Sequence, residues 1–362
     1  MVDVIIFLII LSVLVLIHEL GHFVAAKMFG IRVEEFGLGL PPKAFRLFRK
    51  NGTDFTLNWL PIGGFVKLAG EDYSEDENPL EKDLFFVKPI WQRAIVLTAG
   101  VVMNFVLGVV LFSCVYSYIG VPTKTDRVKI EEVTAGSPAE MVGLRVGDKI
   151  EKLKSDNGEL TIISVDQFVK LVGENKGKEI TLGVISEDGK ERLVKVTPRE
   201  NPPVGEGALG VLLTSVELVH YPAWQMPFRG VVVGLNEAVA WGQEIGKGVF
   251  EMLYGVLMGK LPKDVSGPVG IYQVSTQVSK HGLIPVLQFM GVLSINLAIL
   301  NILPLPALDG GRVVFLGIEK LIGKKLKNRF EGVVHTVGMV VLLGLMAMIT
   351  IRDILKLLGR IG

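Results

Sequence analysis

The sequence predicts an α-helical polytopic membrane protein with four transmembrane helices, a cytoplasmic-side β-hairpin or sheet, and one inserted α+β domain. The 362 residues are 49% hydrophobic and only 21% charged, and their mean hydropathy of +0.47 is too high for an ordinary soluble enzyme. Four apolar segments also reach the ~20 residues that the hydrocarbon core of a bilayer requires. The net charge of +1 gives no reason to expect a nucleic acid as partner.

Basic residues in the connections predict the orientation of the four segments, which are Val4–Phe29, Ile95–Tyr118, Leu283–Leu303 and Val333–Ile351. Lysine and arginine concentrate between the first and second segments and between the third and fourth, and such loops stay on the cytoplasmic side. Both termini and the long insert between the second and third segments are therefore expected on the outer side. Lysines inside that insert do not oppose this, because long domains translocate largely regardless of charge.

The first segment carries ionisable groups at membrane depth. His18, Glu19 and His22 interrupt a run of apolar residues, and burying such groups in lipid costs several kcal/mol, so they mark function by default. The two histidines are four residues apart and project from one face of a helix, which suits Zn²⁺, with Glu19 as the candidate general base. The alternative is two histidines that are satisfied by helix–helix hydrogen bonds.

A carboxylate that follows the third segment is the candidate for a third ligand. Pro304 and Pro306 stop the helix, and the break lets the short side chain of Asp309 reach inward. At 1.5 Å per residue, His18 lies roughly 21 Å from the outer start of its segment, and Asn301 about 26 Å from the start of the third. Asp309 and His18 therefore share the cytoplasmic third of the membrane. A helix-ending turn with a capping aspartate is the alternative.

These motifs resemble those of the site-2 protease family of intramembrane metalloproteases: His18-Glu19-x-x-His22 in a first spanning helix, and Asn301-x-x-Pro304-x-Pro306-x-Leu308-Asp309-Gly310 far downstream. The resemblance implies that His18, His22 and Asp309 bind zinc and that Glu19 is the catalytic base. It also implies that Asn301 contacts substrate or orients the site. The outward insert looks like that of the bacterial branch with PDZ modules, the regulator of sigma-E protease type.

One PDZ copy is expected from about Val128 to Thr197. Its pattern lies in Gly136-Ser137-Pro138-Ala139 and the turn that enters a strand at Ile150, and alternation predicts strands at Ile180–Val184 and Leu193–Val196. Better-known members of this branch carry two tandem modules, so a two-module filter cannot be assumed. Such a domain takes an extended peptide as an added strand. A steric cover without a ligand is the alternative.

Two further regions lie beside the membrane. Ala44–Lys50 and Thr53–Leu60 flank Asn51-Gly52, which predicts a hairpin whose exposed edge captures unwound substrate, or which makes no substrate contact. Met226–Leu261 is apolar with charges on one helical face, which predicts amphipathic helices on the outer interface. A fifth spanning helix there would carry Asp309 to the opposite side from His18. Three remaining histidines are expected to be structural: His220, His281 and His335.

The expected domain order alternates membrane segments with cytoplasmic and outer regions. It runs as the first transmembrane helix with the zinc motif (1–30), the interfacial β region (31–90), the second helix (91–120), the PDZ domain (121–200), amphipathic helices and linker (201–282), the third helix with the Asp-Gly motif (283–311), a cytoplasmic loop (312–332), and the fourth helix (333–362).

The resemblance implies a zinc endopeptidase of the bacterial cytoplasmic (inner) membrane, with its PDZ domain on the outer, periplasmic side. It would cut peptide bonds within transmembrane segments of single-spanning proteins, such as anti-sigma factors or remnant signal peptides. The alternative is a PDZ-bearing membrane adaptor with a structural zinc. Structural sites normally close with four protein ligands, and the sequence offers three with Glu19 adjacent, which favours catalysis.

Overall fold

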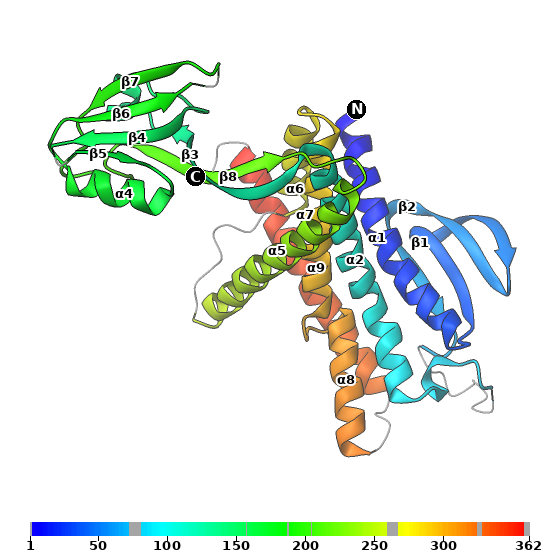
Figure 1. Cartoon of the computed structure of the whole chain (residues 1–362). Helices are drawn as coiled ribbons and strands as arrows, with labels where there is room; N and C mark the ends of the chain where they lie inside the picture. The colour runs from blue at the N-terminus through cyan, green and yellow to red at the C-terminus, as the bar shows by residue number, and fades with distance from the viewer. Residues whose placement is uncertain are drawn as a thin grey trace. The chain divides into compact units, whose positions relative to one another are not determined.

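The computed structural model describes residues 2–71, 81–156, 158–186, 188–203, 205–258, 267–323 and 328–357. The chain divides into two compact units (Figure 1). The helical unit consists of Met1–Tyr118 and Ala223–Gly362, and the inserted unit is Ile119–Pro222. The predicted loop residues 72–80 and 324–327 lie outside the described parts of the chain.

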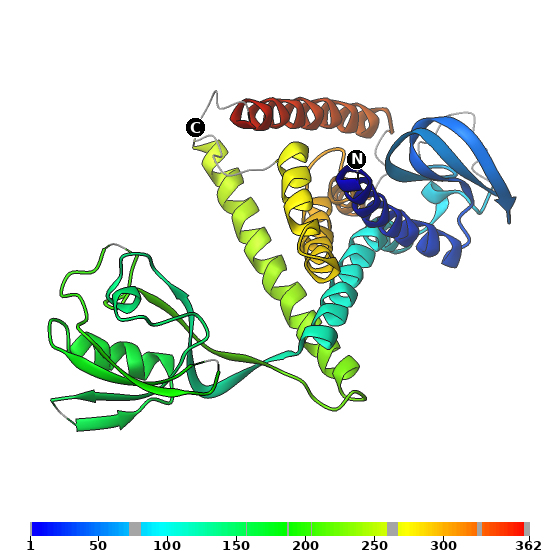
Figure 2. The same cartoon turned by 90° about the horizontal axis from the view of Figure 1, so that it is seen from above.

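Four helices of the helical unit are long and apolar enough to cross a membrane, counted among the described residues and by length and composition. They coincide with the four predicted segments: α1 (Val2–Met28), α2 (Ile90–Ile119), α7 (Leu283–Ile302) and α9 (Asn328–Leu357). Helices α1 and α2 lie side by side in both views (Figures 1 and 2). Gly21 makes this approach possible, because a Cβ there would overlap the carbonyl of Ala99 on α2.

Glycine ends α1 and starts the small sheet. Gly30 takes a φ of 62°, and Ile31 N–H donates to the Ala26 carbonyl at 2.9 Å, which closes the helix and turns the chain. Strands β1 (Val33–Lys50) and β2 (Thr53–Leu68) follow, joined by Asn51-Gly52 with φ values of 50° and 79°. Two positive φ values suit the twist of a two-residue hairpin turn, so the predicted hairpin is confirmed.

Both strands bend, so that the hairpin forms four neighbouring stretches. Residues 33–38 pair with residues 64–68 on one side and with residues 54–57 on the other. Residues 53–58 pair in turn with residues 43–50. Residues 64–68 are one edge of this sheet, and we call them the inner edge. Gly64 lies against α1, where an added Cβ would be 3.5 Å from the Glu19 side chain. The inner edge therefore lies beside the zinc motif.

Three more helices complete the helical unit: α5 (Met226–Leu257), α6 (Pro268–Ser279) and α8 (Asp309–Ile322). Helix α5 packs on α2, because Gly230 and Gly234 leave no room for a Cβ against Ser117 and Ser113. Helix α8 differs from the expected cytoplasmic loop at 312–332. It is amphipathic and anchored by an ion pair between Glu319 and Arg93 of α2, a long-range contact that local sequence does not reveal.

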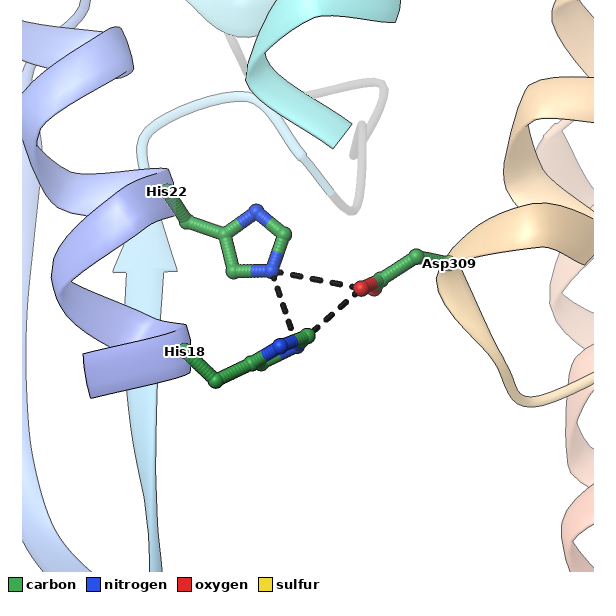
Figure 3. A group of neighbouring side chains, drawn as sticks. All are labelled: His18, His22 and Asp309. Atoms are coloured by element: carbon green, nitrogen blue, oxygen red, sulfur yellow. Dashed lines mark hydrogen bonds and ion pairs between the residues drawn. The ribbon is translucent and has the colours of Figure 1, made fainter. Parts of the chain in front are cut away.

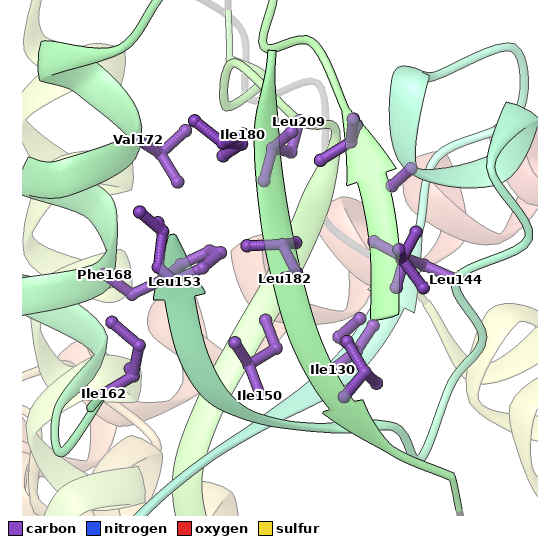
Figure 4. Close-up of a cluster of buried hydrophobic side chains, with 14 of the residues drawn as sticks. Ile130, Leu144, Ile150, Leu153, Ile162, Phe168, Val172, Ile180, Leu182 and Leu209 are labelled. Carbon is purple, nitrogen blue, oxygen red and sulfur yellow. The ribbon is translucent and has the colours of Figure 1, made fainter. Parts of the chain in front are cut away.

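The inserted unit is an α+β domain with strand order β7-β6-β4-β3-β8, and β5 pairs with β4. Its elements are β3 (Val121–Val133), α3 (Pro138–Met141), β4 (Lys149–Ser155), β5 (Gly158–Thr161), α4 (Val165–Glu174), β6 (Ile180–Ile185), β7 (Glu191–Val196) and β8 (Val211–Val219). Their inward side chains form one hydrophobic core (Figure 4). Strands β6 and β7 confirm the alternation read from the sequence. The unit is longer than the expected 121–200, because β8 pairs along β3.

Candidate metal centre

Three side chains meet where α1 faces the start of α8. His18 and His22 project from one face of α1, and Asp309 is the first residue of α8 (Figure 3). Asp309 Oδ2 lies 3.1 Å from His18 Nε2 and 3.3 Å from His22 Nε2, and the two Nε2 atoms are 3.2 Å apart. The predicted i, i+4 pair and the distant carboxylate are therefore brought together.

The spacing of these three atoms fits a zinc ion. Zinc bound to nitrogen or oxygen at ~2.0 Å in tetrahedral geometry has ligand atoms about 3.3 Å apart, which is the separation found here. Within the described parts of the chain this is the one group of three such residues that could hold a metal ion. Catalytic zinc sites have three protein ligands and a fourth position for water or substrate, and a set of three donors would match that pattern.

Helix α2 supports both histidines. His22 Nδ1–H donates to the Val96 carbonyl at 2.8 Å, which fixes the ring and leaves Nε2 for a metal. Gly100 faces the two rings, and a Cβ at this position would overlap His22 Nε2 and lie within 2.8 Å of His18 Nδ1. His18 and His22 are only 8% and 9% exposed. The site therefore depends on a glycine-lined approach of α2.

Asn104 is a supporting residue that the sequence analysis did not identify. It is fully buried on α2, its amide nitrogen Nδ2 lies 3.3 Å from His18 Nδ1, and Oδ1 has no hydrogen-bond partner among the described residues. With the amide turned so that Oδ1 faces the ring, Asn104 would accept the Nδ1–H of His18 and leave Nε2 available to a metal ion. The available signal was a carboxamide within the second apolar segment.

Asp309 is positioned by a tight return of the chain after α7. Gly310 and Gly311 leave no room for a Cβ, because the carbonyls of Ile302, Leu303 and Leu305 lie against them. The start of α8 therefore packs directly against the end of α7 and the residues that follow it.

Glu19 and Asn301 line cavities next to the three-residue cluster. One cavity of about 200 Å³ is lined by His18, Glu19, His22, Phe65, Val66, Leu68, Glu71, Leu97, Ala307, Leu308, Asp309 and Arg312. A second, of about 250 Å³, is lined by Val15, His18, Glu19, Asn104, Leu297, Asn301, Ala307, Leu308 and Asp309. Glu19 belongs to both cavities and Asn301 to the second. Both are thus at the site without belonging to the three-donor cluster.

Two buried histidines and a half-buried carboxylate that could hold a metal ion lie beside a cavity lined by Glu19, and this arrangement is typical of metal-dependent hydrolases. The chain belongs to peptidase family M50, the site-2 protease family, whose profile matches residues 6–345. It is a zinc metalloprotease, which removes the alternative of an adaptor with a structural zinc.

Similar proteins cover nearly the whole chain. A putative zinc metalloprotease of Clostridium perfringens is 36% identical over 95% of this chain and 96% of its own length. The regulator of sigma-W protease RasP of Bacillus subtilis is 31% identical over 98% of both chains. The zinc metalloprotease RasP of Oceanobacillus iheyensis is 31% identical over 99% of this chain and 100% of its own.

Gly100→Ala is expected to lower the zinc content of the purified protein sharply, because the new methyl group occupies space next to both histidine rings. Metal analysis of the purified variant checks this result. The matched control is Gly344→Ala on α9, where a Cβ meets nothing within 4 Å. Full zinc content in Gly100→Ala would contradict the tight fit of α2 against the site.

Proposed function

We propose that this protein hydrolyses peptide bonds within the transmembrane segments of single-spanning proteins in the bacterial cytoplasmic membrane. The observation that carries the proposal is the His18, His22 and Asp309 cluster on a helix that is apolar enough to span the bilayer. One relative is named as the regulator of sigma-W protease, which supports a role in regulated intramembrane proteolysis. Anti-sigma factors and remnant signal peptides are the substrate classes we propose.

Co-expression with a panel of tagged single-spanning proteins tests this function. The wild-type chain is expected to release fragments cut within the membrane segment, and Glu19→Gln is expected to release none. A panel that includes anti-sigma factors and signal peptides and yields no wild-type fragment would contradict the proposed substrate class.

In the proposed mechanism His18, His22 and Asp309 would hold the zinc and Glu19 moves protons. When bound, the zinc would supply Lewis acidity for the attacking water and the scissile carbonyl. Glu19 accepts a proton from the attacking water and delivers it to the leaving amine as the C–N bond breaks. Asn104 and the Val96 carbonyl keep the histidine rings oriented. Asn301, which lines the second cavity, is proposed to contact the substrate.

Water is proposed to reach the site through the first cavity, on the cytoplasmic side. Glu71 and Arg312 line this cavity and form an ion pair with each other. These charged groups hold water where the hydrocarbon supplies none.

We also propose that the inner edge of the small sheet receives the substrate backbone. A transmembrane substrate arrives helical, with its polar groups satisfied, and must unwind before it is cut. Phe65, Val66 and Leu68 line the first cavity together with Glu19. A strand edge at this place pairs with the extended chain and satisfies its backbone groups.

The inserted unit is proposed to be a PDZ domain that excludes uncut substrates with bulky outer parts. Val121 pairs with Val219, so the two ends of the unit are adjacent and a short linker can replace Ile119–Pro222. We expect the deletion variant to bind zinc and to cut full-length precursors without prior trimming, with trimmed forms cut as before.

Recruitment by strand addition predicts the opposite result for the same deletion, namely weaker cleavage of the trimmed form. Cleavage of full-length and trimmed substrates by the deletion variant therefore separates the two roles. Unchanged cleavage of both forms would contradict both.

We expect the inserted unit to lie on the outer side of the membrane and the hairpin turn on the cytoplasmic side. Cys114 is the one cysteine of the sequence, and its replacement by serine gives a background without native thiols. In this background, cysteines at exposed positions of the inserted unit such as Asp126 are expected to react with impermeant reagents from outside. Cysteines at Asn51 and Lys320 are expected to react only from the cytoplasm. Reaction of Lys320→Cys from outside would overturn the four-helix topology.

A further inference from the structure

The loop between α7 and α8 contains a strained residue next to the proposed ligand Asp309. Ala307 has a φ of 72°, and among the described residues the only other non-glycine residue with positive φ is Asn51 in the hairpin turn. Asparagine tolerates this conformation, whereas alanine has no polar group to offset it. Such a residue persists only where its surroundings fix it. The contacts of this loop therefore identify what holds it.

Helix α9 makes two contacts with the loop, one turn apart. Ala307 N–H donates to His335 Nδ1 at 2.9 Å. Gly338 packs against Pro306, where a Cβ on the glycine would overlap the proline ring. Residues three apart share a helix face, so both contacts come from the same side of α9. The imidazole also lies 5.6 Å from the ring of Phe315 on α8.

The restrained loop leads directly to the metal centre. Ala307 and Leu308 line both cavities with Asp309, and Leu308 N–H donates to the Leu305 carbonyl at 3.3 Å. A change of backbone angle at Ala307 displaces the first residue of α8, which is Asp309. The Asp309 carboxylate lies within 3.3 Å of both histidines, a spacing that such a displacement would alter.

We propose that His335 is a positioning residue for the metal centre: it holds Ala307 in its strained conformation and so aims Asp309 at His18 and His22. This inference rests on the proposed zinc ligands. It assigns to α9, which contributes no ligand, a role in metal affinity. The histidine acts as the acceptor through Nδ1, so its hydrogen is on Nε2.

The test compares zinc dissociation constants of full-length variants in detergent, measured by competition with a chromophoric chelator. His335→Leu removes the acceptor and is expected to weaken zinc binding ~10-fold, the lower end of losses found for groups that orient metal ligands. His335→Asn restores an acceptor near the Nδ1 position and is expected to recover most of the affinity. The matched control is His281→Leu in the turn that follows α6, and this variant is expected to bind zinc as the wild type does.

Hydrogen exchange of the metal-free protein gives a readout that does not depend on zinc. The Ala307 amide is expected to exchange faster in His335→Leu than in the wild type or in His281→Leu. Gly338→Ala, which pushes on Pro306 without touching the histidine, is expected to weaken zinc binding as well, and Gly344→Ala is not.

Failure of the positioning role and failure of the proposed ligand set give different results. If Asp309→Ala loses zinc but His335→Leu shows unchanged zinc affinity and unchanged hydrogen exchange, the positioning role of His335 is overturned. If Asp309→Ala also kept its zinc, the proposed ligand set would fall, and the inference with it. Equal losses in His335→Leu and His281→Leu would likewise overturn the inference, because the effect would then not be specific to the loop.

Discussion

Glu19→Gln is expected to retain one zinc per chain and to lose proteolysis by at least ~100-fold, within the range that a positioned general base contributes. Glu19 lines both cavities but is not one of the three clustered donors, so its loss should leave the metal in place. Glutamine keeps the shape of the side chain and cannot accept the proton of the attacking water. Metal analysis and a cleavage assay on the same preparation measure both quantities.

The control for this variant is Glu244→Gln, the same chemical change at an exposed position of α5. It is expected to match the wild type in zinc content and cleavage. Loss of zinc from Glu19→Gln would make Glu19 a ligand, and full activity would place the catalytic base elsewhere.

Asp309→Ala is expected to lose both zinc and activity, as are His18→Ala and His22→Ala. Removing any one of three protein donors leaves two, and the remaining pair does not enclose the ion. For Asp309 the loss leaves His18 and His22 on one helix with no donor from α8 opposite them. Zinc content after dialysis against a mild chelator, together with cleavage, measures the effect.

Asp126→Ala is the matched control, because Asp126 is exposed on β3 of the inserted unit. It is expected to keep its zinc and its activity. If Asp309→Ala instead retained zinc and full activity, the third ligand would have to be another group.

The sequence alone predicted the features of this protein whose signals lie close together in the chain. Segment hydrophobicity predicted the four helices that are long and apolar enough to cross a membrane, the Asn51-Gly52 pair predicted the hairpin, and four-residue spacing placed His18 and His22 on one face. The position of Asp309 next to the two histidines was predictable because Pro304 and Pro306 break the helix before it. Each of these signals lies within a few residues of the feature that it predicts.

The remaining features depend on contacts between distant segments. Gly100 and Asn104 matter because α2 packs against the histidines of α1, and the role inferred for His335 depends on α9 touching the loop before α8. Strand β8 was not predicted, because its place follows from pairing with β3 about 90 residues earlier in the chain. A single sequence carries no signal for such pairs.

X-ray absorption at the zinc edge of the purified wild-type chain tests the central claim most directly. The account predicts one zinc bound by two imidazole nitrogens and by oxygen atoms at about 2.0–2.2 Å, with no sulfur. It also predicts that this signal disappears in Asp309→Ala. A sulfur ligand at about 2.3 Å, or a first shell unchanged in Asp309→Ala, would contradict the assignment of His18, His22 and Asp309 as the zinc site.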